Sequence, residues 1–389
     1  MEAQRTEAQR TGIYLDHAAT TPLRPSVLTA YVEALGVVGN PSSIHSQGQQ
    51  AKRMLEEARE AVASSLGADA VEVTFTSGGT EAINLAIKGL FWSQRALDPA
   101  KRRILVSRAE HHATIDAVEW LEQHEGAVVD WIPVDSAGRI DLAYVESALA
   151  DDVALVTALW ANNEVGTIQP VEALVALAAV HGVPVHCDAV SAYGHVPIDF
   201  HSSGLAALSV SAHKIGGPVG VGALVISRAT TVTPLLHGGN QQRARSGTQD
   251  SAGAVAFGVA ASLPLFDSTT LRDRLIAGVQ RAVPTAIPRG DPLDRLPNNA
   301  HFTFPGCEGD SLLFLLDAAG FIVSTGSACQ AGVPEASHVL LAMGLSEPDA
   351  RGALRITVGH ETTEAEVDAF LAALPAAVER ARSAGMAAG

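Results

Sequence analysis

Seven short apolar runs, separated mostly by helical stretches, restrict this chain to a small set of folds. The runs are VEVTFT (71–76), RILVSR (103–108), VVDWIPV (128–134), VALVTALW (153–160), VPVHCDA (183–189), AALSVSA (206–212) and GALVIS (222–227). Several are apolar throughout rather than alternating, which is typical of strands covered on both faces. The sequence therefore predicts a mainly parallel seven-stranded sheet in a large α/β/α domain. The short spacing between the last two runs predicts one antiparallel strand.

The pattern changes after about residue 255. Amphipathic helices are expected at 270–283 and 364–385, and strands at 298–304, 321–326 and 354–359. We predict a large α/β domain over 21–254. A small α+β domain is predicted over 255–389, joined by residues 12–20, and the polar residues 1–11 are expected to be a disordered tail.

Composition excludes several classes of function. A net charge of −16 argues against a nucleic-acid surface. The three cysteines have no zinc spacing and form no disulfide framework, so a cytoplasmic location is expected. The N-terminus carries acids and does not read as a signal peptide. The longest apolar stretch, residues 251–266, is too short to span a bilayer and is predicted to be a buried helix, so no membrane partner is expected.

The stretch STGSACQAG (324–332) places Cys329 among small residues and glycines. A structural cysteine is normally buried and packed, whereas a segment like this is typical of an exposed thiol that reacts. A turn that merely needs a small residue is the alternative. Cys187 lies in a predicted strand and Cys307 near a turn, so structural roles are expected for both.

Polar residues follow several predicted strands at the end where open α/β sheets bind ligands. Ser77, Gly78, Gly79 and Thr80 lead directly into a helix, whose free N–H groups suit an anion, although an ordinary capped helix start would look the same. The next strands are followed by His111 and His112, by Asn162 and Asn163, by Asp188, and by Lys214. A histidine pair alone is more often a surface feature or a cap than a site.

One cofactor accounts for these residues together. Pyridoxal phosphate needs a lysine to hold it, an acid facing its ring nitrogen and a cradle for its phosphate. The chain has Lys214 and Asp188 at strand ends and a glycine-rich helix start at 78–80. It lacks both the GxGxxG and the GxxxxGK[ST] patterns of nucleotide sites.

Ten motifs then resemble one family in order and spacing, over the whole chain except its first dozen residues. They are YLDHAATTP, GNPSSIH, FTSGGTEAINLAIKG, EHHATID, WANNEVGTIQP, HCDAVSAYG, SAHKIGGPVGVGAL, RARSGTQD, STGSACQAG and LRITVGHETT. This set resembles a cysteine desulfurase of the NifS/IscS type, in the class V aminotransferase superfamily with the fold-type I architecture. The resemblance implies removal of sulfur from L-cysteine by a homodimer with pyridoxal 5'-phosphate.

The resemblance also implies a role for each matched residue. Lys214, His111 and Cys329 would be catalytic, and Asn40 and Arg355 would hold the substrate carboxylate. The cofactor would be contacted by Gly79, Thr80, His111, Asn163, Asp188, Ser191, Ser211, His213 and Lys214, and by Thr248 reaching into the partner subunit's site. No resident metal is implied, although Cys329 would serve as a transient iron–sulfur ligand through its persulfide.

Cys329 would attack the substrate sulfur as a thiolate, leaving alanine and a persulfide. An unperturbed thiol, with a pKa of about 8.5, is only slightly ionised at neutral pH. A nearby base or positive charge should therefore help the thiol to ionise, and His111 is the candidate for that role. The segment would have to swing to deliver its sulfur, with Gly326 and Gly332 as hinges. The acceptor would be an iron–sulfur scaffold, a tRNA-thiolation carrier or a carrier of a dedicated pathway.

Three positions depart from the family pattern. Ser191 stands in place of the usual Gln, and Gln242 stands where an acid is common. Ala212 replaces a Gly and is expected to add a methyl group near the phosphate. The alternatives are a selenocysteine lyase, a class V aminotransferase, or a non-catalytic scaffold that kept the fold. Transamination has no need of Cys329, and a scaffold has no need of both Lys214 and Cys329.

Overall fold

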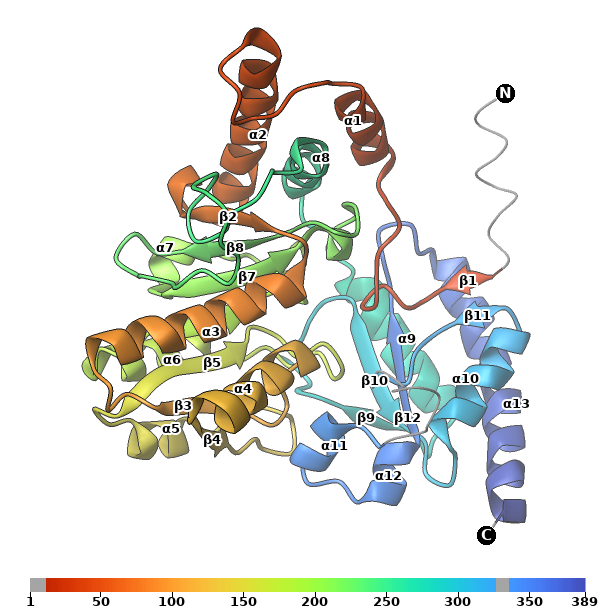
Figure 1. Cartoon of the computed structure of the whole chain (residues 1–389). Helices are drawn as coiled ribbons and strands as arrows, with labels where there is room; N and C mark the ends of the chain where they lie inside the picture. The colour runs from red at the N-terminus through yellow and green to blue at the C-terminus, as the bar shows by residue number, and fades with distance from the viewer. Residues whose placement is uncertain (1–11, 327–335, 389) are drawn as a thin grey trace.

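A seven-stranded sheet forms the centre of the larger part of the molecule (Figure 1). The computed structural model describes residues 12–326 and 336–388, the last five by their backbone alone. The strand order is β2-β8-β7-β6-β5-β3-β4. The strands are β2 (Val73–Thr76), β3 (Arg103–Ser107), β4 (Val128–Ile132), β5 (Val153–Leu159), β6 (Val185–Asp188), β7 (Ala207–Ser211) and β8 (Gly222–Ile226). All seven predicted strands are confirmed, and β8 is antiparallel to both β2 and β7.

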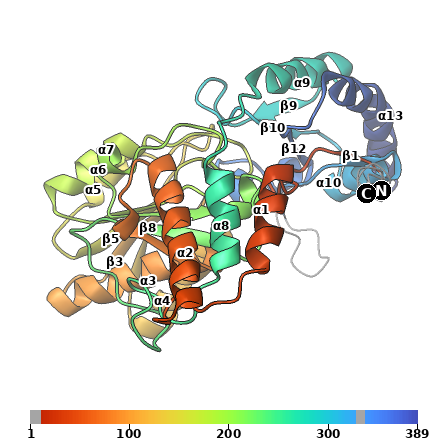
Figure 2. The same cartoon turned by 90° about the horizontal axis from the view of Figure 1, so that it is seen from above.

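Helices cover both faces of this sheet, as the apolar strands require (Figure 2). One face packs against α3 (Gly79–Leu97) and α4 (His112–Glu125), and the side chains between them form one buried cluster. A second cluster lies on the other face. The helices on that side are α2 (Ser46–Ser65), α5 (Leu142–Ala148), α6 (Val171–Val180), α7 (Phe200–Ser203) and α8 (Ser251–Ala261).

The smaller part has its own apolar core around a three-stranded antiparallel sheet of order β12-β10-β9. Its strands are β9 (Ile287–Arg289), β10 (Asn299–Thr303) and β12 (Ala353–Thr357), and β1 (Ile13–Tyr14) pairs in parallel with β11 (Phe321–Ile322). Its helices are α9 (Thr269–Ala282), α10 (Gly309–Ala318), α11 (His338–Ala342), α12 (Glu347–Arg351) and α13 (Glu364–Ala388). The short β9 carries too few apolar residues to stand out in the sequence.

The predicted boundary at residue 255 lies inside α8. This helix packs against α2 and against α1 (Pro25–Leu35), so it lies with the larger part over its whole length. We therefore propose that the division between domains lies in the connection 262–268. The predicted buried helix at 251–266 is confirmed over the residues of α8. Among the described helices, none combines the length and apolar character that crossing a membrane requires.

Two fully buried histidines make the fold sensitive to acid. His186 lies in β6, with Nδ1 2.9 Å from Thr157 Oγ1 and Nε2 2.8 Å from Ser209 Oγ, so its ring joins three adjacent strands. Burial lowers the pKa of His186 to about 3. The pKa of His301, in β10, is also lowered to about 3 by burial and by nearby arginines, with Arg355 the largest of them.

We expect the chain to lose about 2 kcal/mol of stability per buried histidine between pH 7 and pH 5. The pKa is lower in the folded chain than in the unfolded chain, so between about pH 3 and 6.5 the unfolded state binds more protons. Urea midpoints at the two pH values measure this, and His186→Gln should reduce the difference. His181→Gln, at an exposed site, is the control. An unchanged pH dependence in His186→Gln would contradict this account.

Candidate active site

A cavity of about 390 Å³ lies at the carboxyl ends of the parallel strands. Nearly all the residues predicted for the cofactor reach it. Its walls include Gly79, Thr80, His111, Asn163, Asp188, Ser191, Ser211, His213 and Lys214, and Arg355 enters from the smaller part. These residues follow β2, β3, β5, β6 and β7, so the fold gathers them at one edge of the sheet.

Lys214 lies half-buried in this cavity at the end of a 3-10 turn, Ala212–Lys214. Its Nζ donates hydrogen bonds to the carbonyls of Ala18 and Ala19. Burial, and then the charge of Arg355, lower the pKa of Lys214 to about 8, against an opposing effect of Asp16 and Asp188. A lysine with this pKa has a substantial neutral fraction near pH 7–8, which is the form that can bond to a carbonyl carbon or accept a proton.

Asp188 ends β6 as a fully buried carboxyl group. Burial raises its pKa to about 6, although the Val190 N–H at 2.9 Å and the charge of Lys214 both act to lower it. The raised pKa indicates that the Val190 N–H and Lys214 do not fully offset the cost of burying the ionised carboxylate. A protonated ring nitrogen would supply the missing charge.

His111 forms the N-cap of α4. Its Nδ1 accepts a hydrogen bond of 3.0 Å from Ala113 N, which places the proton of the neutral ring on Nε2. Burial, and then the charge of Lys214, lower the pKa of His111 to about 4. The imidazole is therefore neutral at pH 7, so His111 supplies no positive charge there; its alternative role as a base for the thiol stays a prediction. A neutral ring suits stacking.

The start of α3 has the properties of an anion cradle. Gly78 has φ 150°, a conformation that favours glycine, although a side chain there would meet nothing within 4 Å. At Gly79 the constraint is space, because a Cβ would lie 2.8 Å from Val190 Cγ2. Ser211 Oγ faces the same cavity, and no described residue bonds to it. Free backbone N–H groups and a spare hydroxyl at a helix start suit a phosphate.

Arg355 is held rigidly at the opposite wall. Its Nη1 donates to the Asn163 carbonyl and its Nη2 to Asp16 Oδ1, both at 2.9 Å. Its Nε has no partner among the described residues. A guanidinium has five N–H donors, so Arg355 keeps others besides the two engaged ones, Nε–H among them, and an arginine already oriented in this way can bind a carboxylate at little entropic cost.

The unpartnered polar atoms fit pyridoxal phosphate. Besides Ser211 Oγ and Arg355 Nε, Asn163 Oδ1 is buried without a partner among the described residues. Ser211 Oγ suits a phosphate, Arg355 Nε suits a substrate carboxylate, and Asn163 Oδ1 suits a ring hydroxyl. Lys214 would hold the cofactor covalently and Asp188 would face its ring nitrogen.

Two predicted site residues, Asn40 and Thr248, do not line this cavity. Asn40 is exposed in the connection between α1 and α2, and its Oδ1 accepts a hydrogen bond from Ser42 N instead. Thr248 is exposed and does not line the cavity of its own chain. Cys329 and Gly332 lie outside the described residues. Cys187 and Cys307 are both buried, as expected of structural cysteines.

The structure also explains two of the departures from the family pattern. Ala212 is fully buried in the core, where its methyl group lies close to Gly217, and it does not line the cavity, contrary to the expectation of a methyl group near the phosphate. Gln242 accepts from the Phe75 N–H at 3.0 Å and donates to the Phe75 carbonyl at 2.7 Å. An acid could not make both bonds, so the amide suits the edge strand β2.

Sequence reasoning missed several polar neighbours of the cavity. Glu164 lines it and accepts a hydrogen bond of 2.5 Å from Ser337 Oγ. Glu110 is buried, with Oε1 accepting from Leu159 N at 2.9 Å, and burial raises its pKa well above the usual value. Asp16 orients Arg355. All three acids lie within the quoted motifs, and their position beside assigned residues was the available signal.

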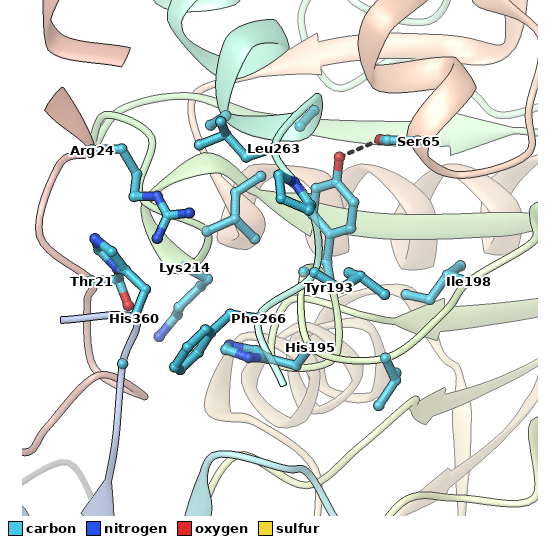
Figure 3. Close-up of a pocket in the computed structure, with 18 of the residues that line it drawn as sticks. Thr21, Arg24, Ser65, Tyr193, His195, Ile198, Lys214, Leu263, Phe266 and His360 are labelled. Atoms are coloured by element: carbon cyan, nitrogen blue, oxygen red, sulfur yellow. Dashed lines mark hydrogen bonds between the residues drawn. The ribbon is translucent and has the colours of Figure 1, made fainter. Parts of the chain in front are cut away.

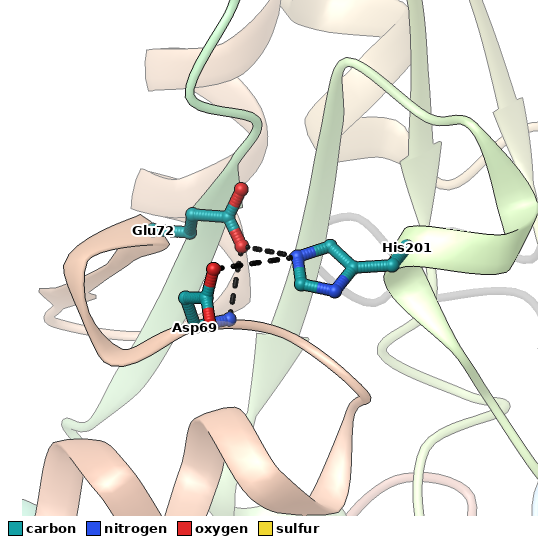
Figure 4. Close-up of side chains that lie close together, drawn as sticks. All are labelled: Asp69, Glu72 and His201. Carbon is teal, nitrogen blue, oxygen red and sulfur yellow. Dashed lines mark hydrogen bonds and ion pairs between the residues drawn. The ribbon is translucent and has the colours of Figure 1, made fainter.

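A separate cluster on the larger part, Asp69, Glu72 and His201, has the composition of a metal site (Figure 4). Glu72 Oε2 accepts from Asp69 N at 2.9 Å and lies 2.8 Å from His201 Nε2. Asp69 Oδ2 is 2.5 Å from Arg228 Nη2. A cation would have to displace these donors, so we interpret the cluster as a clamp on the turn Ala70–Glu72.

Comparisons with known proteins agree with this geometry. Residues 13–370 match the family described as aminotransferase class-V. An IscS-like cysteine desulfurase of Mycobacterium tuberculosis is 51% identical over 387 residues, covering 96% of this chain and 98% of that protein. A solved NifS-like protein superimposes with a TM-score of 0.86 at 34% identity, covering 95% and 100% of the two chains.

A second solved structure, of SspA in complex with cysteine, is 32% identical with a TM-score of 0.80, and covers 89% of this chain and 98% of its own. The match thus extends over nearly the full length of each protein compared. The chain belongs to the class-V aminotransferase family and, within it, to the cysteine desulfurases of the NifS/IscS type, which depend on pyridoxal phosphate.

Proposed function

We propose that this desulfurase removes sulfur from L-cysteine, releases L-alanine, and carries the sulfur as a persulfide on Cys329 to an acceptor protein. The observation that supports the proposal most directly is the convergence of Lys214, Asp188 and Arg355 on one cavity. Together they supply a group that moves protons, a partner for a ring nitrogen and a site for a carboxylate.

Binding of the substrate would begin at Arg355. Its guanidinium is fixed by Asn163 and Asp16, so the free Nε–H would meet the carboxylate of L-cysteine without reorientation. When bound, pyridoxal phosphate supplies an electron sink for the bonds broken at the substrate. Lys214, with a pKa of about 8, would take the α-proton and later return a proton to the carbon that becomes the methyl group of alanine.

The sulfur step would belong to Cys329. Its thiolate attacks the substrate sulfur and forms an S–S bond, while the C–S bond breaks and its electron pair stays with the carbon. The product is a persulfide, whose outer sulfur is then transferred when a thiolate of the acceptor attacks it. Because the pKa of His111 is low, we assign its neutral ring to stacking and to local proton exchange at Nε2.

Mass spectrometry of the wild-type enzyme tests this assignment. After incubation with L-cysteine and no reductant, the peptide that contains Cys329 should gain one sulfur atom, and alanine should form in equal amount. Addition of a thiol reductant should remove the added mass and release sulfide. Alanine formation with the added sulfur on Cys187 or Cys307, or on no cysteine, would contradict the role of Cys329.

We also propose a homodimer, in which Thr248 reaches the partner subunit's cofactor phosphate. The outer face of α1 supports this, because Leu28, Val32 and Leu35 are 49%, 60% and 61% exposed at helical spacing. Val38 and Ile44, in the connection that follows, are 84% and 93% exposed. Such a contiguous apolar face is typical of an interface.

Val32→Glu is therefore expected to weaken dimerisation by about tenfold or more, because it places a charge in an apolar contact. Sedimentation over a range of protein concentrations measures this. Leu97→Glu is the matched control, since Leu97 is 79% exposed at the far end of α3. Equal dimerisation of both variants would show that α1 does not form the interface.

The acceptor is proposed to be a protein that presents a nucleophilic thiolate, with an iron–sulfur scaffold as the first candidate and a tRNA-thiolation carrier as the second. Reduced thiols at Cys329 and at the acceptor fit a cytoplasmic location.

A further inference from the structure

A second cavity of about 400 Å³ lies beside the active-site lysine (Figure 3). Its walls include Thr21 and Arg24 before α1, the turn after β6, Lys214 and Ile215 after β7, the connection that follows α8, and Gly359 and His360 after β12. Lys214 belongs to the walls of both cavities. The second cavity therefore lies where the larger and smaller parts of the molecule meet, which is a common place for small-molecule sites.

The lysine and arginine in the walls of this cavity are not matched by an acid in the lining, although Glu361, just outside it, lies 3.6 Å from His360 Nε2. The walls hold Arg24 and Lys214 and two histidines, His195 and His360 (Figure 3). No Asp or Glu belongs to the described lining, in a chain whose net charge is −16. A cavity without acids in so acidic a protein favours an anion.

Arg24 is the strongest cation available to a ligand. No hydrogen bond or ion pair connects its guanidinium to a residue that the structure describes, and desolvation lowers its pKa. Its side-chain stem lies against Gly216, where a Cβ would be 2.4 Å from Arg24 Cγ. The backbone N–H of Arg24 donates to the Gly216 carbonyl at 3.0 Å, which anchors the residue at the cavity wall.

His195 offers a neutral donor in the same walls. Burial lowers its pKa to about 4, so the ring is neutral at pH 7. Its Nε2 lies 3.3 Å from the Asn298 amide nitrogen, which can only donate, so the ring proton sits on Nδ1. This Nδ1 is buried and has no partner among the described residues.

Most of the remaining wall is apolar, apart from Thr21 and the hydrogen-bonded pair Ser65 and Tyr193. Leu263, Pro264, Leu265 and Phe266 line it from the connection after α8, and Ile198 and Ile215 line it from the larger part. A ligand that fits this surface needs an apolar body as well as its negative group. The volume lies within the range of roughly 300–1,000 Å³ that is usual for small-molecule sites.

We propose that this cavity binds a small organic carboxylate, with its charge at Arg24 and its apolar body against Leu263–Phe266. The site is separate from the one that Arg355 provides for the substrate, and it does not depend on the desulfurase mechanism. Because Lys214 lies in both sets of walls, an occupied second cavity changes the surroundings of the cofactor's attachment point.

Calorimetry on the enzyme with its cofactor bound tests this, with 3-phenylpropionate as the probe and the uncharged 3-phenylpropionamide as its matched analogue. Wild type should bind the acid and not the amide. Arg24→Gln should weaken binding by about tenfold or more, because it removes a charge-assisted bond. Arg53→Gln, at an exposed site on α2, should bind as wild type does.

The active-site cavity also holds an arginine, so a third variant separates the two sites. Arg355→Gln should leave the affinity for 3-phenylpropionate within about twofold of wild type. A loss in Arg355→Gln with none in Arg24→Gln would place the acid in the active-site cavity and overturn the proposal. Absence of saturable binding by wild type would overturn it as well.

Discussion

Replacing Cys329 by serine is expected to abolish sulfide production from L-cysteine, with a fall in turnover on the order of 10³-fold or more, because a neutral hydroxyl cannot take over the role of a thiolate at sulfur. The cofactor should stay bound, because Lys214, Asp188 and the start of α3 are unchanged. The change in cofactor absorbance on addition of L-cysteine should also persist, since Arg355 still binds the carboxylate.

The matched control is Cys307→Ser. Cys307 is 4% exposed, and its Sγ lies 3.7 Å from the Val378 carbonyl, so a hydroxyl there keeps a hydrogen-bond acceptor. This variant should retain most of the wild-type turnover. Full activity of Cys329→Ser would remove Cys329 from the mechanism, whereas loss of its cofactor absorbance would show that the substitution acts on the fold rather than on sulfur transfer.

Lys214→Ala is expected to lower turnover by roughly 10⁴-fold or more, because this one substitution removes both the covalent attachment of the cofactor and the group that moves protons. The variant should release pyridoxal phosphate on dialysis, while wild type keeps it. Borohydride reduction of wild type should fix the cofactor to a single peptide, the one that contains Lys214.

Lys52→Ala serves as the comparison, because Lys52 is exposed on α2. It should bind the cofactor and turn over as wild type does. Reduction that fixes the cofactor at Lys52, Lys88 or Lys101 would show that the assignment of Lys214 is wrong.

The strands of the larger part could be predicted because the same local pattern, a short apolar run, marks each of them. A central strand covered on both faces needs a mainly apolar run. The run 153–160 therefore predicted a buried strand, and β5 occupies it. The strand-end positions of Asp188 and Lys214 followed from the same pattern. The antiparallel β8 could be predicted because the connection 212–221 leaves no room for a crossover helix between it and β7.

Features that depend on partners distant in sequence could not be read in the same way. The exposed strand β9 is three residues long and gains its place only by pairing with β10. The charge state of His111 depends on burial and on Lys214, more than 100 residues away, so a sequence motif could not distinguish a cation from a neutral cap. The cavity at Arg24 likewise forms only where several segments remote in sequence meet.

The pairing of β1 with β11 has a consequence for synthesis of the protein on the ribosome. Residues 13 and 14 are made about 300 residues before their partners at 321 and 322 emerge. Asp16 must wait longer still for Arg355, and Ala18 N for Thr357 Oγ1. Since Lys214 Nζ donates to the carbonyls of Ala18 and Ala19, the finished cofactor site forms only after residues 355–357 have emerged. Capture of pyridoxal phosphate would thus mark the end of folding, and a truncated nascent chain would not display the yellow colour of the holoenzyme.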